Sequence, residues 1–403
     1  MTTLWATIVV IGVLVFVHEL GHYLAARCVG IRVERFSVGF PPRLFTFTSE
    51  DKGWLIQMYF FYRPSGGKWE WQVVWKKQVL VSGKVGTGTE YCLALIPLGG
   101  YVKMAGIIDE SMDTNITSAP DEFMSKSFLS QVFVMSAGVI MNVLFAFSVY
   151  TGLSYHFGKL VENPPAIVSQ LVDEMPAKEA GILSGDKITS VNGEPVDNWN
   201  DMVQHIHSIP EKMITLEIDR DGNSITERFK TSSQVVHTVS GMDTVGFIGI
   251  APAIQFYDFF LGLYYITDSD INIFQASLSG INSTMTGFGI IVMSINMLIS
   301  GEASIEELGG PIMIAQLAGA TAKAGIPTLL SFMALISINL AFLNILPIPG
   351  LDGGHIFISI IQVIIRKPLS VKTRMIFQQI GMAFLLLLMI IVFYNDIGRL
   401  FIN

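Results

Sequence analysis

Four stretches of the chain are apolar along their whole length and long enough to cross a bilayer, which takes about 20 residues of helix. None of the four contains Lys, Arg or Asp, and only the first contains Glu or His. The predicted spans are Leu4–Ala26, Val132–Leu153, Ile326–Leu351 and Met375–Tyr394. A fifth uncharged stretch, Ile271–Gly301, is rich in Ser, Thr, Asn and Gly, and we interpret it as an interfacial helix rather than a span.

Composition supports a polytopic α-helical membrane protein with a modest soluble part. Of the 403 residues, 51% are hydrophobic and only 14% are charged, which is too apolar for an ordinary soluble protein. The net charge of −8 comes without a basic cluster, so nucleic acid is not an expected partner. Cys28 and Cys92 are too few for a disulfide framework. Because no basic residue precedes the first apolar stretch, we expect a retained helix rather than a cleaved signal peptide.

The distribution of basic residues predicts an orientation in the membrane. Of the 25 Lys and Arg residues, 12 lie between Arg27 and Lys126, and four more lie between the last two spans. By the positive-inside rule both basic loops are cytoplasmic, so both termini and the region between the second and third spans are extracytoplasmic. A reversed topology is the alternative.

The segment from 30 to 105 alternates aromatic and β-branched residues with turn signals. This pattern predicts several short strands, most clearly Lys68–Leu80 and Glu90–Ile96. The stretch Tyr91–Lys103 is apolar enough to enter the membrane edge, where irregular backbone is tolerated only against protein or a wet cavity. An exposed strand edge here would accept an extended substrate by strand addition. The alternative is a hairpin that only covers the helices.

Charged residues return between about 163 and 250, and we predict a separate soluble domain there. The expected elements are strands at Ala166–Leu171, Lys187–Val191 and Ile214–Asp219 and a helix near Asn200–Ser208. The run Ala180–Val196, AGILSGDKITSVNGEPV, resembles the AGL-x-x-GD-x-I-x-x-VNG run of PDZ domains of the bacterial protease type. That resemblance implies a groove for a peptide or a C-terminus. Whether such a groove binds substrate or only excludes large proteins stays open.

The first span contains the sequence His18-Glu19-Leu20-Gly21-His22. Ionisable side chains are costly at membrane depth and indicate a functional site. On a helix, residues four apart lie on one face, so His18 and His22 can bind one Zn²⁺ while Glu19 activates a water molecule. A buried polar network without metal is the alternative. The spacing predicts a site for one zinc ion and peptide-bond hydrolysis within the bilayer.

A second polar motif, Asn344-Ile-Leu-Pro-Ile-Pro-Gly-Leu-Asp-Gly-Gly-His355, ends the third span. Catalytic zinc usually takes three protein ligands, and Asp352 is the best candidate for the third, with a simple helix cap as the alternative. Pro347 and Pro349 would break the helix, and the glycines after Asp352 would let the backbone pack closely. We interpret His355 as a supporting residue rather than a ligand.

Taken together, HELGH in the first span, N-x-x-P-x-P-x-L-D-G-G-H later and a PDZ run between them resemble the site-2 protease family of intramembrane zinc metalloproteases. The resemblance is to its bacterial branch, the regulator-of-sigma-E proteases. It implies His18, His22 and Asp352 as ligands of one Zn²⁺ and Glu19 as the catalytic base. It also implies that Asn344 and Asn339 position the substrate backbone, although either could instead bond a neighbouring helix.

The resemblance also implies that the strand-rich region before Met104 is a membrane-reentrant β-structure. Strand pairing of the substrate near Gly99, Gly100 and Tyr101 would offset the hydrogen bonds lost when its helix unwinds. The full expected organisation is 1–28 first span, 29–130 cytoplasmic-side reentrant β-rich region, 131–156 second span, 163–250 PDZ domain, 251–325 interfacial segment, 326–355 third span and 375–395 fourth span.

Two departures from the family pattern concern regions away from the metal motifs. Many relatives carry two tandem PDZ domains, whereas this chain has the signature of one. The segment from about 48 to 85 resembles an insertion, and its four tryptophans favour seating at the bilayer interface. They are Trp54, Trp69, Trp71 and Trp75.

The expected activity is intramembrane hydrolysis of single-span membrane proteins, of the anti-sigma-factor or signal-peptide-remnant type, in a bacterial inner membrane. The expected partners are these substrates, the lipid bilayer and a peptide or C-terminus at the PDZ groove. Two other functions remain: a metal transporter, which would need ligands along a path, and a membrane scaffold, which would not need Glu19.

Overall fold

The computed structural model describes the chain as two compact units. The first comprises Met1–Val149 and Thr284–Asn403, and the second comprises Tyr150–Ser283. The residues described are 2–63, 70–81, 86–107, 117, 119–238, 241–252, 254, 256–266, 271–304, 309–367 and 369–402. Trp69, one of the four tryptophans expected at the interface, therefore lies outside the described residues.

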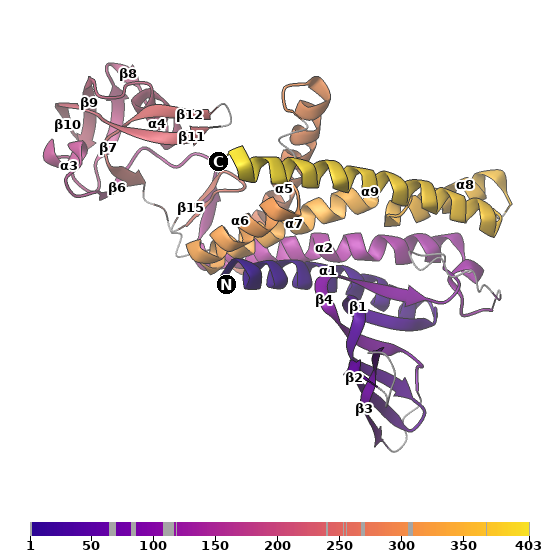
Figure 1. Ribbon diagram of the computed structural model, residues 1–403. Coiled ribbons are helices and arrows are strands. Elements are labelled where there is room, and N and C mark those ends of the chain that lie inside the picture. The colour runs from indigo at the N-terminus through magenta and orange to yellow at the C-terminus, as the bar shows by residue number, and fades with distance from the viewer. Residues whose placement is uncertain are drawn as a thin grey trace. The chain divides into compact units, whose positions relative to one another are not determined.

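Helices make up most of the first unit (Figure 1). In chain order they are α1 (Thr2–Cys28), α2 (Phe128–Phe157), α5 (Ile273–Ser300), α6 (Pro311–Ala324), α7 (Ile326–Ile345), α8 (Asp352–Ile365) and α9 (Val371–Ile402), with a short 3-10 turn at Phe123–Ser125. Helices α2 and α5 each run across a boundary between the units. Helix α6 packs on α1 and on α7.

The number of helices able to cross a membrane differs from the prediction. Among the described residues, five helices are long and apolar enough, by length and composition: α1, α2, α5, α7 and α9. Helix α5, Ile273–Ser300, is the additional one, so the predicted count of four is not confirmed. Its scattered Ser, Thr and Asn lowered its apparent hydrophobicity, but hydroxyls in a helix can bond backbone carbonyls of the preceding turn. Ser277 and Ser294 do so here.

The first unit also contains a four-stranded sheet in the order β3-β2-β1-β4. Its strands are β1 (Val33–Glu50), β2 (Gly53–Tyr62), β3 (Glu70–Leu80) and β4 (Glu90–Met104). The predicted strand at Lys68–Leu80 is confirmed from Glu70 onward, and the one at Glu90–Ile96 continues to Met104.

Strands β1 and β4 each bend, so that each pairs twice with the other. Ser37 of β1 lies opposite both Tyr101 and Cys92 of β4, and the later residue Thr46 lies opposite Cys92 again. The last residues of β4 therefore form one edge of the sheet, against α1, and β3 forms the opposite edge.

The second unit is mostly strands. It comprises β5 (Lys159–Val161), β6 (Val168–Leu171), α3 (Pro176–Glu179), β7 (Lys187–Val191), β8 (Glu194–Pro195), α4 (Trp199–His207), β9 (Met213–Arg220), β10 (Asn223–Lys230), β11 (Ser232–Thr238), β12 (Gly241–Phe247), β13 (Ile250–Pro252), β14 (Phe256–Asp258) and β15 (Leu263–Ile266). The three predicted strands and the predicted helix are confirmed within a few residues. Helix α4 begins where the Asn198 side chain accepts a hydrogen bond from the backbone N–H of Asp201, a standard N-cap.

An ion pair between the buried Asp186 and the partly exposed Arg220 holds one corner of the second unit. Asp186 is 1% exposed and accepts hydrogen bonds at 2.7 Å from Nε and Nη2 of Arg220, and one from the backbone N–H of Leu183. The fully buried Ile188, Ile214 and Leu216 form the core beside it. The Arg220 side chain holds the pKa of the Asp186 carboxyl below its usual range.

Candidate metal centre and active site

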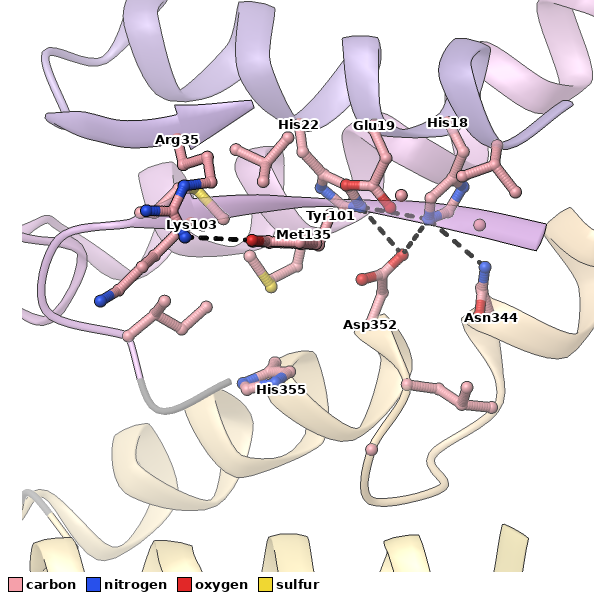
Figure 2. A pocket seen from close by; sticks show the side chains of 18 of the residues that line it. His18, Glu19, His22, Arg35, Tyr101, Lys103, Met135, Asn344, Asp352 and His355 are labelled. Atoms are coloured by element: carbon pink, nitrogen blue, oxygen red, sulfur yellow. Dashed lines mark hydrogen bonds and ion pairs between the residues drawn. The ribbon is translucent and has the colours of Figure 1, made fainter. Parts of the chain in front are cut away.

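Helix α1 turns the two histidines of the HELGH motif to one face, as the spacing predicts. Both are buried, and their Nε2 atoms lie 3.2 Å apart. The carboxylate Oδ2 of Asp352, the first residue of α8, lies 3.2 Å from each of those nitrogens. Residues separated by more than 300 positions in the sequence therefore place three ligand atoms at the corners of one triangle (Figure 2).

The size of this triangle fits zinc. Nitrogen and oxygen ligands lie about 2.0–2.1 Å from tetrahedral zinc, which puts neighbouring ligand atoms about 3.3 Å apart. The three edges of 3.2 Å match that spacing. In addition, Oδ2 of Asp352 is buried and has no hydrogen-bond donor among the described residues. A buried carboxylate oxygen without a donor is costly, and a cation between the three atoms would satisfy it.

The loop between α7 and α8 carries Asp352 to this position. Helix α7 ends at Ile345, just before Pro347 and Pro349, as predicted. A Cβ on Gly353 would lie 2.2 Å from the carbonyl oxygen of Leu346, and one on Gly354 would lie 2.4 Å from that of Ile348. Only glycine permits this close return of the backbone. Gly353 and Gly354 therefore allow the close backbone packing that was predicted after Asp352.

Helix α2 contacts the Nδ1 atoms of both imidazole rings, and the sequence analysis did not predict these contacts. Nδ1 of His22 donates to the carbonyl oxygen of Val134 at 2.8 Å, leaving Nε2 unprotonated in the neutral ring. The amide of Asn142 lies 3.2 Å from Nδ1 of His18. Oδ1 of Asn142 is buried and has no partner among the described residues. With the amide turned over, that oxygen accepts the His18 ring proton and frees Nε2 in the same way.

Gly138 lies on α2 midway between Val134, which contacts His22, and Asn142, which contacts His18, about one helical turn from each. A Cβ at this position would lie 2.5 Å from Nε2 of His22 and 2.6 Å from Cε1 of His18. The position must therefore be glycine for the rings to occupy their places. The spacing of four between Val134, Gly138 and Asn142 on an apolar helix was the available signal.

The triangle opens into a cavity of about 670 Å³, within the usual range for ligand sites. Most of the residues predicted for the site line it. These are His18, Glu19, His22, Gly99, Gly100, Tyr101, Asn344 and Asp352. His355, predicted as a supporting residue, also lines it but does not belong to the group of three ligand atoms.

The structure does not bring Asn339 to the cavity, although it was predicted together with Asn344 to position the substrate backbone. The Asn339 side chain is exposed and does not line the cavity, whereas Asn344 is buried with Nδ2 3.4 Å from Nε2 of His18. Five residues along a helix correspond to a rotation of about 140°, so the two asparagines of α7 face different directions.

Strand β4 forms one wall of the cavity. Six consecutive residues, from Gly99 to Met104, line it. Successive residues of a strand point to opposite faces, so a continuous run means that the backbone edge borders the cavity. The approach to α1 is close: a Cβ on Gly100 would lie 3.1 Å from Cγ1 of Val15 and 3.6 Å from Cγ of Glu19.

Tyr101 is fixed by a polar cluster at the cavity wall. Its hydroxyl accepts a hydrogen bond from Nη1 of Arg35 at 3.1 Å, and Nε of Arg35 donates to Glu90 at 2.8 Å. Arg35 also lines the cavity, and the sequence analysis did not identify it.

Apolar helices that enclose a glutamate and three converging zinc-type ligands define a metal-dependent hydrolase of the membrane. The chain belongs to peptidase family M50, whose model matches residues 6–72 and 71–388. It is a zinc metalloprotease and a membrane protein.

Curated relatives match over nearly the whole chain. A relative from Clostridium perfringens is 32% identical over 385 residues, which cover 95% of each chain. The zinc metalloprotease RasP of Bacillus licheniformis is 29% identical and is matched over 100% of both chains. The regulator of sigma-W protease RasP of Bacillus subtilis is 29% identical over 99% of both.

Among solved structures, the PDZ domain of the SdrC-like protein from Listeria innocua is 22% identical to this chain. The match covers 22% of this chain and 91% of that one, with a TM-score of 0.17.

Proposed function

We propose that this enzyme hydrolyses a peptide bond within the transmembrane segment of single-span membrane proteins. The observation that carries the proposal is the triangle of His18, His22 and Asp352 beside Glu19, among helices apolar enough to cross a bilayer. A peptide bond that reaches this cavity comes from a substrate segment lying at the depth of α1.

In this proposal His18, His22 and Asp352 hold one zinc ion. The metal supplies Lewis acidity that makes water acidic enough to lose a proton near neutral pH. Glu19 accepts that proton and later delivers it to the leaving amine. Val134 and Asn142 keep the two rings in the tautomer that a metal ligand requires.

The edge of β4 is the proposed receptor for the substrate backbone. A helical amide is shielded by its own hydrogen bonds, so the substrate segment must unwind before cleavage. Pairing with Gly99, Gly100 and Tyr101 replaces the hydrogen bonds lost in unwinding, and the amide of Asn344 bonds the backbone from the opposite wall.

The proposed substrates are anti-sigma factors or signal-peptide remnants, cleaved in regulated intramembrane proteolysis. The support is the name of the Bacillus subtilis relative, a regulator of sigma-W protease. We place the enzyme in a bacterial inner membrane with both termini and the second unit extracytoplasmic, following the basic loops. The strand-rich region from 29 to 130 is then the membrane-reentrant segment on the cytoplasmic side.

We further propose that residues 163–250 form a PDZ domain that receives a peptide or a C-terminus. A cavity of about 220 Å³ lies beside helix α4 and strand β13 of the second unit. Its lining includes Val203 and Ile206 from the helix and Ile250 and Ala251 from the strand. An apolar groove next to a strand is suited to strand addition.

The test is Glu19→Gln in full-length enzyme co-expressed with candidate single-span membrane proteins. Because the amide cannot accept the proton, we expect cleavage to fall by about 10²–10⁴-fold while one zinc ion per chain is retained. Glu34→Gln, on β1 and outside the cavity lining, is the matched control and should cleave normally. Undiminished cleavage by Glu19→Gln would contradict the proposal, whereas a transporter or a scaffold would cleave no substrate even as the wild-type chain.

A further inference from the structure

Helix α9 exposes most of its side chains, and three of its described residues are buried: Gln378, Gly381 and Asp396. Asp396 accepts hydrogen bonds from the backbone at the start of α6. Gly381 allows close packing, because a Cβ at this position would collide with the carbonyl oxygen of Pro349. Contacts within the protein therefore explain the burial of two of the three residues, and Gln378 remains.

Gln378 is a buried carboxamide without a partner. Its side chain is 4% exposed and forms no hydrogen bond with the described residues. The neighbouring Gln379 is exposed. Buried polar groups are nearly always hydrogen-bonded, and an amide left unpaired among apolar groups is costly. The amide of Gln378 is therefore suited to bind a group that enters from outside the chain.

The side chain of Gln378 lines the active-site cavity. Gly381, one helical turn further along α9, packs on Pro349 in the loop that carries Asp352. This close approach holds α9 beside the loop and presents Gln378 to the cavity. Among the described residues that line the cavity, Gln378 and Asn344 are the two carboxamides.

The two carboxamides belong to different ends of the cavity. Nδ2 of Asn344 lies 3.4 Å from Nε2 of His18. Gln378 instead lines a second, smaller cavity together with His355. Asn344 and His355 lie on opposite sides of Asp352 in Figure 2. Gln378 therefore lies at the end of the cavity that Asn344 does not reach.

An extended substrate in this cavity needs partners along both of its edges. One edge pairs with β4, and alternate N–H and C=O groups of the substrate then point away from that strand. Left unpaired in a largely apolar cavity, those groups are costly. A carboxamide offers both a donor and an acceptor, so it can replace part of a second strand.

We propose that Gln378 binds the substrate backbone on the side of the scissile bond opposite to Asn344. This assignment rests on the proposed function and extends it. Strand β4 holds one edge of the extended substrate, and Asn344 and Gln378 hold the other edge on either side of the ligand triangle. Because these contacts are made to backbone groups, they position the peptide bond without selecting a sequence.

The test measures binding to full-length enzyme in vesicles, in a Glu19→Gln background that leaves the probe uncleaved. The probe is a synthetic single-span peptide of leucine and alanine with a central Gly-Ser pair and a fluorescent label, and anisotropy gives its Kd. We expect Gln378→Leu to raise Kd by about 3–10-fold, the effect of losing one hydrogen bond, at unchanged zinc content. Gln379→Leu on the exposed face of α9 is the matched control and should leave Kd unchanged.

A second set of probes separates a hydrogen bond from a change of shape. In each peptide one backbone ester replaces one amide, at successive positions on either side of the Gly-Ser pair. An ester has no N–H and is a weaker acceptor, so one of these peptides should bind more weakly to enzyme that retains Gln378. The same ester should cause no further loss in Gln378→Leu, whereas a residue that only packs the helix would leave the ester effects equal in both enzymes.

Three results would overturn the assignment. These are equal Kd values for Gln378→Leu and Gln379→Leu, ester effects that are identical with and without Gln378, and a loss of zinc in Gln378→Leu alone. If enzyme that retains Gln378 does not bind the peptide, the proposed function itself fails, and the assignment fails with it. If Gln378→Leu does not fold, Gln378→Ala gives the same measurements.

Discussion

Two carboxylates on the C-terminal helices, Asp352 and Asp396, are bound in opposite ways. Asp396 on α9 is 1% exposed and accepts hydrogen bonds from the backbone N–H groups of Gly310, Ile312 and Met313, at the start of α6. Asp352 on α8 is 16% exposed. Its Oδ2 accepts no hydrogen bond among the described residues, although Nε2 of His18 and Nε2 of His22 each lie 3.2 Å from it.

The difference separates a structural carboxylate from the proposed zinc ligand. The partners of Asp396 are fixed backbone donors at a helix N-terminus, where negative charge is favourable, together with the Arg399 guanidinium 3.9 Å from its Oδ1, so no metal ion is needed there. Asp352 faces two ring nitrogens, each of which takes the acceptor form when Nδ1 holds the proton. Three acceptors that face one another repel unless a cation lies between them. Satisfaction of the polar atoms thus distinguishes the two roles. The first three of the following experiments test that distinction, and the last tests a third carboxylate, which is paired with an arginine.

Asp352→Asn should have the largest effect. The amide cannot provide the anionic oxygen, so we expect zinc to be lost and cleavage to fall below detection. The loss in metal affinity should exceed the roughly 10–100-fold typical of a changed outer partner. Metal analysis of purified protein and cleavage of a co-expressed substrate measure both effects. Retention of one zinc per chain would remove Asp352 from the ligand set.

Gly138→Ala should come next. The added methyl group would lie 2.5 Å from Nε2 of His22, so the rings must move and the triangle must widen. We expect zinc affinity, measured by chelator competition, to fall by about 10–100-fold. Gly152→Ala on the same helix is the control, because no atom lies within 4 Å of its added Cβ. Both changes raise helix propensity alike, so equal zinc affinity in the two variants would refute the steric argument.

Asp396→Ala should reduce stability and leave the metal in place. Removing the carboxylate leaves the buried N–H group of Gly310 and the partly buried N–H group of Ile312 without an acceptor, at a cost of about 1–3 kcal/mol. A lowered midpoint of thermal unfolding at unchanged zinc content is the expected result. Loss of zinc without a change in that midpoint would reverse the assignment of the two aspartates.

The second unit offers a smaller, pH-dependent effect at Asp186. Its pKa is held below the usual value by Arg220, so the folded state binds fewer protons than the unfolded state at low pH. The stabilisation is present above the unfolded pKa of about 3.9 and is lost as pH falls through the lower, folded value. Hydrogen exchange of the β7 and β9 amides in the full chain should therefore accelerate as pH falls from about 5 to about 3, after correction for intrinsic exchange.

In Asp186→Asn the same amides should exchange faster already at neutral pH and show a weaker dependence on acid. If the wild-type protein and this variant respond to acid alike, the ion pair with Arg220 does not stabilise the folded unit.

Much of the site could be predicted because its chemistry is local in sequence. The spacing of His18 and His22 sets both rings on one face of a helix, and two prolines with two glycines imply a sharp return that carries Asp352 inward. The contributions of Asn142 and Gly138 could not be predicted, because they depend on which face of α2 packs against α1. Tertiary packing decides which face of α2 meets α1, and the residue pattern of an apolar helix gives little indication of that face.

The differences between the predictions and the structure have the same origin. Asn339 and Asn344 are both polar residues in one apolar helix, and their sequence positions alone did not distinguish the inward face from the outward one. Ser and Thr in α5 count as polar on a hydropathy scale, but in a helix their hydroxyls can bond to backbone carbonyls of the same chain. The bends of β1 and β4, which let each strand pair twice, depend on long-range register that the alternation of residues does not encode.

The order in which the ligand atoms are synthesised has a consequence for the cell. His18 and His22 leave the ribosome early, but Asp352 follows only after most of the chain has been made. A nascent chain therefore lacks one member of the proposed ligand set until Asp352 has been made. Under that proposal, proteolytic capacity would follow the docking of Asp352 beside the two histidines rather than precede it.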